Sequence, residues 1–225
     1  MSQLSQLFPP CPKFTDKDIP DQSGRVFIVT GGASGVGFEV SRILYEKNAT
    51  VYIATRTASK IEAAIGRIKE QYQTSHGKLE ALILDLEDLA TIKPAVENFM
   101  SKEQRLDVLF NNAGVMGTNP DERSVQVKKS IFICRLLEPI LLNTAAHQNS
   151  SAGSIRVVWV SSMLDIGTPK GGVVWDLETD ELTIHPDMMS NYMQSKAGIT
   201  FLGHEYAKRF GKKGIISTVK FHLIS

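Results

Sequence analysis

The stretch TGGASGVG at residues 30–37 decides the fold, because its surroundings define what this glycine-rich turn can do. It follows the apolar run RVFIVT at residues 25–30 and precedes residues 35–48, whose apolar side chains recur at helical spacing. Glycines between a strand and a helix let the backbone approach a phosphate group closely. The start of the helix also offers unpaired N–H groups and a partial positive charge. This context favours a nucleotide-binding turn over a plain flexible turn.

Short β-branched runs and helical patterns alternate along the rest of the chain. We predict further strands at residues 50–54, 79–84, 106–110, 154–160 and 215–219. We predict further helices at residues 58–72, 89–100, 126–147 and 191–210, with Pro94 marking a kink or a late start. Apolar strands joined by helices are typical of a parallel sheet covered on both faces. The sequence therefore predicts an α/β fold with a single Rossmann-type, doubly wound sheet over residues 25–225. Residues 1–24, with Pro9, Pro10, Pro12 and Pro20, read as a separate arm.

Composition excludes several classes of protein. The chain has 225 residues, with 25 basic and 24 acidic side chains, so it lacks the positive charge expected of a nucleic-acid-binding domain. Cys11 and Cys134 form no C-x-x-C motif, and the histidines show no metal-ligand spacing, so we expect no metal. No apolar run is long enough to span a membrane. Residues 1–20 lack a secretory signal pattern, which favours a cytoplasmic protein.

The end of the second predicted strand bears on the choice of nucleotide. An NAD-preferring site usually places an acidic residue here, to bind the ribose 2′-hydroxyl. This chain instead has Arg56, with Lys60 one helical turn further on. A cation suits a 2′-phosphate through charge-assisted hydrogen bonds, so NADP is favoured over NAD. A solvated surface arginine is the alternative.

Two further turns follow strands at the same predicted edge of the sheet. Asp85 follows residues 79–84, where it would either lie near the adenine amino group or cap the next helix. Asn111-Asn112-Ala113-Gly114 follows residues 106–110. Its small residues allow close approach to a flat ring system, although such clusters are also common in plain turns.

The candidate chemistry comes from a serine pair and a helix. Ser161 and Ser162 end the fifth predicted strand, while Tyr192 and Lys196 are spaced to share one face of the last helix. A tyrosine hydroxyl has a pKa near 10 and is a poor base at neutral pH. A neighbouring ammonium group favours the phenolate by ~1 kcal/mol in water but by ~4 kcal/mol at an effective dielectric constant near 20. The pair therefore needs a partly dry cleft. The alternative is an ordinary surface pair on an amphipathic helix.

These motifs, in this order, resemble the short-chain dehydrogenase/reductase family. The resemblance covers residues 25–219. Within the family, the chain looks like the retinol-dehydrogenase-like members, including fungal ones. It implies an oxidoreductase that moves a hydride between the nicotinamide of NADP, or less readily NAD, and a carbonyl group or alcohol of a small lipophilic compound. It also implies Ser162 as the substrate-orienting residue, Tyr192 as the general acid/base, and Lys196 as the cation that binds the nicotinamide ribose and acidifies the phenol. The long helices flanking the fourth and fifth strands often pair in this family, which implies a homo-oligomer as one arrangement.

The same resemblance assigns a set of cofactor contacts. The residues that it implies are Gly31, Ser34, Gly35, Val36, Gly37, Arg56, Asp85 and Asn112, together with Tyr192 and Lys196; the charge argument above adds Lys60.

Two departures from the family pattern qualify the expected activity. Family members carry an asparagine in the helix after the fourth strand, which holds a proton-relay water, but no asparagine occurs between Asn119 and Asn143 here. This region also reads as shortened. After residues 215–219, the family continues with a Pro-Gly turn, a substrate-lid helix and a last strand, which this sequence lacks. A shortened, non-catalytic nucleotide-binding protein is therefore the alternative to an active enzyme.

Overall fold

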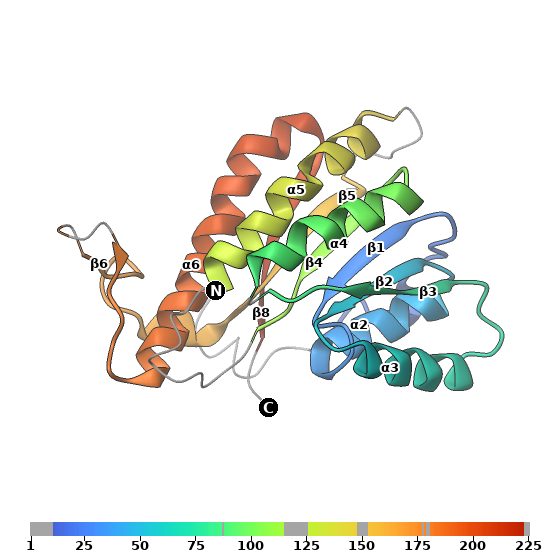
Figure 1. The fold of residues 1–225 in the computed structure, drawn as a ribbon, viewed down its shortest axis with the longest axis horizontal. Helices are drawn as coiled ribbons and strands as arrows, with labels where there is room; N and C mark the ends of the chain where they lie inside the picture. The colour runs from blue at the N-terminus through green and yellow to red at the C-terminus, as the bar shows by residue number, and fades with distance from the viewer. Residues whose placement is uncertain are drawn as a thin grey trace.

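Six parallel strands form the centre of the protein in the computed structural model, which describes residues 11–86, 88–114, 126–147, 153–176, 178 and 181–222 (Figure 1). The strands are β1 (Val26–Thr30), β2 (Thr50–Thr55), β3 (Lys78–Ile83), β4 (Val108–Asn111), β5 (Ile155–Ser162) and β8 (Ile215–His222). They lie in the order β3-β2-β1-β4-β5-β8, with every neighbouring pair parallel. The chain therefore winds outward from β1 in both directions, which confirms the predicted doubly wound α/β sheet.

Strand β1 is buried on both faces because alternate side chains serve two hydrophobic clusters. Val26 and Ile28 join the cluster built with helices α4 (Leu89–Lys102), α5 (Gln126–Ala146) and α6 (Met188–Phe210). Phe27 and Val29 join the opposite cluster, with helices α2 (Gly35–Glu46) and α3 (Ala58–Gln71). A strand between two helical layers cannot alternate between apolar and polar residues. This explains why the first strand reads as a continuous apolar run.

The predicted elements are all present, and their ends differ by a few residues. Helix α6 begins at Met188, before the predicted residue 191, because the carboxylate of Asp187 accepts hydrogen bonds from the N–H groups of Met189 and Ser190. Helix α4 begins at Leu89, where Asp88 accepts from the N–H of Ala90 at 2.9 Å. Pro94 therefore lies inside α4, and the late start that we had considered is wrong.

The sequence analysis missed a small two-stranded unit between β5 and α6. Strands β6 (Trp175–Asp176) and β7 (Glu181–Leu182) pair antiparallel and project beside α6, apart from the main sheet (Figure 1). These strands are too short to show an alternating pattern, so no periodicity marked them. The hairpin follows a 3₁₀ turn, η2 (Met163–Gly167), that comes directly after Ser162.

The described part of the arm, residues 11–24, has a single 3₁₀ turn at Asp16–Asp18 and then packs against the end of α2. The N–H of Gln22 donates to the carbonyl of Lys47 at 2.7 Å, and the amide of Asn48 donates to the carboxylate of Asp21 at 2.7 Å. Residues 1–10 of the predicted arm lie outside the described residues.

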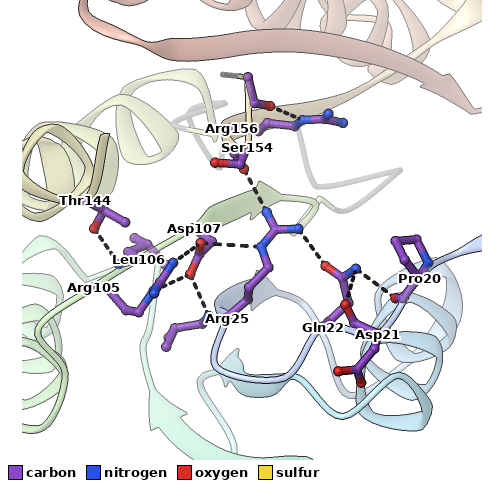
Figure 2. Close-up of polar contacts among 12 residues, drawn as sticks. Pro20, Asp21, Gln22, Arg25, Arg105, Leu106, Asp107, Thr144, Ser154 and Arg156 are labelled. Atoms are coloured by element: carbon purple, nitrogen blue, oxygen red, sulfur yellow. Dashed lines mark hydrogen bonds and ion pairs between the residues drawn. The ribbon is translucent and has the colours of Figure 1, made fainter. Parts of the chain in front are cut away.

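A buried carboxylate joins the amino ends of β1, β4 and β5. Asp107, with 1% of its area exposed, accepts from the N–H of Val26 at 2.8 Å and from two nitrogens of Arg105 at 2.7 and 2.9 Å (Figure 2). Arg25 also pairs with Asp107 and donates to the carbonyl of Ser154 at 2.8 Å. Because buried charges require partners, this network fixes the three strand starts relative to one another.

We predict that Asp107→Asn lowers the free energy of unfolding by roughly 2–4 kcal/mol, because the change weakens both arginine contacts and disturbs the acceptor for a buried N–H group. Glu205→Gln is the control, since it removes the same charge from an exposed pair with Arg209 and should cost far less, because exposed ion pairs contribute little to stability. Urea denaturation measures both values. Equal losses in the two variants would contradict a special role for Asp107.

Candidate nucleotide-binding and catalytic site

The glycine-rich turn joins β1 to α2 in the geometry that its sequence predicts. Gly31 and Gly35 have φ values of 68° and 54°, in the left-handed region that favours glycine. Helix α2 starts at Gly35, and its N-cap residue Ser34 makes no side-chain capping hydrogen bond. The first N–H groups of a helix lack intrahelical partners. The N-terminus of α2 can therefore donate hydrogen bonds from these N–H groups to an anion.

Close backbone packing holds the turn against the strand beside it. A Cβ atom added at Gly37 would lie 2.4 Å from the carbonyl oxygen of Gly31 and 2.5 Å from the amide nitrogen of Asn112. That amide nitrogen donates to the carbonyl of Thr30 at 2.9 Å. Gly37 and Asn112, both predicted as cofactor contacts, thus lie behind the turn and support it.

Thr30 is a site residue that the sequence analysis overlooked. Its hydroxyl donates to the carbonyl of Phe110 at 3.1 Å and accepts from the N–H groups of Asn112 and Ala113 at 3.0 and 2.9 Å. One side chain therefore ties the glycine-rich turn after β1 to the Asn-Asn-Ala-Gly turn after β4. A hydroxyl residue at the end of the first strand, just before the glycines, was the signal available in the sequence.

A pocket of about 250 Å³ opens at the carboxyl ends of β1, β2 and β3. Its lining comprises Gly31, Ala33, Ser34, Ala54, Thr55, Arg56, Lys60, Leu84, Asp85, Leu86, Ala113, Gly114 and Ser130. Five of the predicted cofactor contacts lie together here: Gly31, Ser34, Arg56, Lys60 and Asp85. Gly35 and the exposed Val36 lie beside it in the first turn of α2.

Ser130 is a second residue that sequence reasoning missed. It lies on α5, has 6% of its area exposed and lines the pocket. One turn further along α5, Cys134 accepts a hydrogen bond from the amide of Asn111 at 3.2 Å, and burial raises the pKa of this thiol to about 12.

The position of Asp85 settles one of the two alternatives left by the sequence. The cap of α4 is Asp88, so Asp85 does not cap that helix. The backbone of Asp85 is fixed by Thr91, whose hydroxyl donates to its carbonyl at 2.9 Å. Asp85 lines the pocket, and its contact with an adenine base stays a prediction.

Helix α6 is bound directly to the end of β5. The hydroxyl of Ser161 donates to the carbonyl of Lys196 at 2.9 Å, and the ammonium group of Lys196 donates to the carbonyl of Val160 at 3.2 Å. Lys196 is 7% exposed, and burial lowers the pKa of its ammonium group below the usual value. The Lys196 side chain is thus held in a largely desolvated position beside β5.

Tyr192 lies next to this lysine. The Lys196 nitrogen is 5.5 Å from the centre of the Tyr192 ring, as the shared helix face predicts. Ser162 is buried at the end of β5, where its hydroxyl accepts from the N–H of Leu164 at 3.3 Å. The described residues include no direct hydrogen bond between the Ser162 and Tyr192 side chains. This arrangement leaves each hydroxyl able to bond a third group.

Among the helices that the structure describes, none is long and apolar enough to cross a bilayer. In the same part of the chain, no group of three or more His, Cys, Asp and Glu side chains is arranged to hold a metal ion.

Comparisons with known proteins agree with these features. The family model described as short chain dehydrogenase matches residues 25–174. A short-chain dehydrogenase/reductase of Phomopsis amygdali is 42% identical and is matched over 95% of this chain and 66% of its own length. The short-chain dehydrogenase/reductase sthC of Phaeosphaeria nodorum is 41% identical, over 95% of this chain and 71% of its own. The chain thus spans about two thirds of the length of these curated relatives.

Solved structures give the same answer for the fold. The RhlG/NADP active-site complex of Pseudomonas aeruginosa has a TM-score of 0.69 and 25% identity, covering 88% of this chain and 71% of that one. The NAD⁺-bound xylitol dehydrogenase has a TM-score of 0.71 and 17% identity, covering 89% of this chain and 70% of that one, a likeness of fold alone. Because the family model matches more than half of the sequence and relatives exceed 40% identity, the chain belongs to the short-chain dehydrogenase/reductase family.

Proposed function

We propose that this protein is an NADP-dependent oxidoreductase that interconverts a carbonyl group and an alcohol on a small lipophilic substrate. The observation that carries the proposal is that two sites lie at the carboxyl ends of the strands of one sheet. A pocket lies beyond β1–β3, and the buried Lys196 lies beside Tyr192 at the end of β5. In open α/β sheets, this edge is where ligands bind.

The residues present fit a dinucleotide. The first turn of α2 offers N–H groups without a side-chain cap, which suits a pyrophosphate. A Cβ at Gly35 would meet nothing within 4 Å, so the space beside this turn is open to a ligand. Asp85 and Leu86 line the pocket where the base would lie, and Ser130 faces it from α5.

Arg56 and Lys60 support NADP rather than NAD. Both are exposed at the mouth of the pocket, after β2 and in the first turn of α3. Their positive charges would hold a 2′-phosphate, whereas no acidic residue stands at the end of β2 to bind a 2′-hydroxyl. Similar solved structures include complexes with NADP and with NAD⁺, so the preference is argued from these side chains.

Hydride transfer, proton transfer and charge stabilisation would each involve a different group of the site. A bound dinucleotide supplies or accepts the hydride at the carbonyl carbon. The Tyr192 hydroxyl would give a proton to the carbonyl oxygen during reduction and take one back during oxidation. The Lys196 ammonium group would place a positive charge beside the Tyr192 ring, and the Ser162 hydroxyl would donate to the substrate oxygen as negative charge develops there.

Two exposed methionines support an apolar substrate. Met188 and Met189 are 43% and 40% exposed in the first turn of α6. They precede Tyr192 by four and three residues, so they share its helix face. Flexible thioether side chains adapt to apolar ligands of varied shape.

The first prediction from this proposal concerns the glycine-rich turn. Gly37→Ala should lower the free energy of unfolding by roughly 1–3 kcal/mol, because the added methyl group collides with the Gly31 carbonyl. It should also abolish measurable NADP binding in calorimetric titration. Gly66→Ala is the matched control, since its Cβ would meet nothing within 4 Å in α3; it should raise stability by about 0.4–1 kcal/mol. Normal NADP binding by Gly37→Ala would count against the proposed phosphate site.

The second prediction concerns the choice of dinucleotide. Arg56→Glu should weaken NADP⁺ binding by about 10–100-fold, the cost of losing a charge-assisted hydrogen bond and adding a repulsive charge. NAD⁺ binding should change by less than about threefold, since its 2′-hydroxyl carries no charge. Lys69→Glu makes the same charge change on α3 away from the pocket and should affect neither ligand. Equal losses for the two dinucleotides in Arg56→Glu would refute the assignment to a 2′-phosphate.

The third prediction concerns the proton. Tyr192→Phe should reduce the rate of NADPH oxidation with a panel of apolar ketones and aldehydes by about 10²–10⁴-fold, with little change in the dissociation constant of NADP⁺. An undiminished rate would reject Tyr192 as the acid/base. If the unsubstituted chain binds NADP⁺ but turns over no carbonyl compound, it is a nucleotide-binding protein without catalysis.

A further inference from the structure

Three residues beside Tyr192 on α6 contact one connecting segment, residues 163–187: Asn191, Met193 and Gln194. This segment begins after Ser162 at the end of β5 and ends at the start of α6. It therefore connects the two elements that carry the hydroxyl groups of the proposed site. The attachment of this segment to α6 therefore acts on the placement of those hydroxyl groups in addition to the direct bonds between α6 and β5.

Gln194 makes the central attachment. Its side chain is 6% exposed, its amide oxygen accepts from the N–H of Val174, and its amide nitrogen donates to the carbonyl of Thr183 at 3.0 Å. Val174 and Thr183 stand at the two bases of the β6–β7 hairpin and are joined by a hydrogen bond of 2.9 Å. One amide group thus holds both strands of the hairpin, with its donor and its acceptor used.

Two neighbouring residues fix the ends of the segment. Asn191 donates to the carbonyl of His185 at 2.7 Å and accepts from its N–H at 2.8 Å. Met193 packs on η2, where a Cβ added at Gly167 would lie 2.6 Å from its sulfur. Residues two apart in a helix point in nearly opposite directions, so Gln194 and Tyr192 face away from each other. Helix α6 is therefore held by β5 on one face and by the hairpin on the other.

We propose that Gln194 is a positioning residue: it fixes the hairpin on the outer face of α6 and thereby holds Tyr192 at the working distance from Ser162. This inference rests on the proposed function, because it assumes that the two hydroxyls meet one substrate oxygen. Misplacement of a catalytic group by about 1 Å can lower a rate by about 100-fold, so an attachment outside the reacting groups can control turnover.

The test uses two substitutions and a fluorescent reporter within the segment. Gln194→Met keeps the length of the side chain and removes both hydrogen bonds. Gln194→Glu keeps an acceptor for Val174 and loses the donor to Thr183. The chain has two tryptophans, of which Trp159 is fully buried and Trp175 in β6 is 47% exposed. Acrylamide quenching of fluorescence therefore reports mainly on the hairpin. Gln104→Met, at an exposed glutamine, is the control.

In Gln194→Met, we expect quenching to increase and kcat to fall by about tenfold or more, while the dissociation constant of NADP⁺ stays unchanged. In Gln194→Glu, both quenching and kcat should lie between the values of the parent and of Gln194→Met. In the control Gln104→Met, both should equal those of the parent. Unchanged quenching in Gln194→Met would overturn the attachment. Increased quenching with an unchanged kcat would overturn the positioning role. If the parent shows no turnover, the proposed function fails, and quenching alone decides whether Gln194 holds the hairpin.

Discussion

The hydroxyl group of Thr30 is the contact on which the nucleotide side of the protein depends. It binds the turn after β4 through two N–H groups and the end of β4 through one carbonyl, while the backbone of Thr30 leads directly into the glycines. Gly37 then packs against Gly31 and Asn112 with no room for a side chain. Two segments distant in sequence, residues 30–37 and 110–113, are thereby brought into one corner, and the pocket beyond β1–β3 opens from it.

Stability and chemistry lie at opposite ends of the same strands. At the amino ends, Asp107 is buried and satisfied by arginines and a backbone N–H group, which fixes the spacing of β1, β4 and β5. At the carboxyl ends, small residues and helix starts leave backbone groups and hydroxyls available to ligands. The separation has a physical cause: a network with every polar group paired is rigid but cannot bind anything else.

The fold followed from the sequence because its signals are local and repeated, as in the buried run of β1 and the helical spacing after Gly35. The grouping of Arg56, Lys60 and Asp85 could also be predicted, since parallel strands end at one edge. Ser130 and the β6–β7 hairpin could not. Their roles arise from contacts between distant segments, which a pattern of residue types within a short window does not contain.

Burial of the Lys196 ammonium group, which the proposed chemistry requires, lowers the stability of the folded protein. Burial lowers the pKa of its ammonium group, so the unfolded chain binds this proton more tightly than the folded one. Stability should therefore rise with pH between the lowered pKa and the usual value of the unfolded chain, and the full penalty applies below that window. The hydrogen bond to Val160 offsets only part of it. A chain selected for stability alone would place an apolar side chain here, so a buried cation beside a tyrosine ring argues for selection by function.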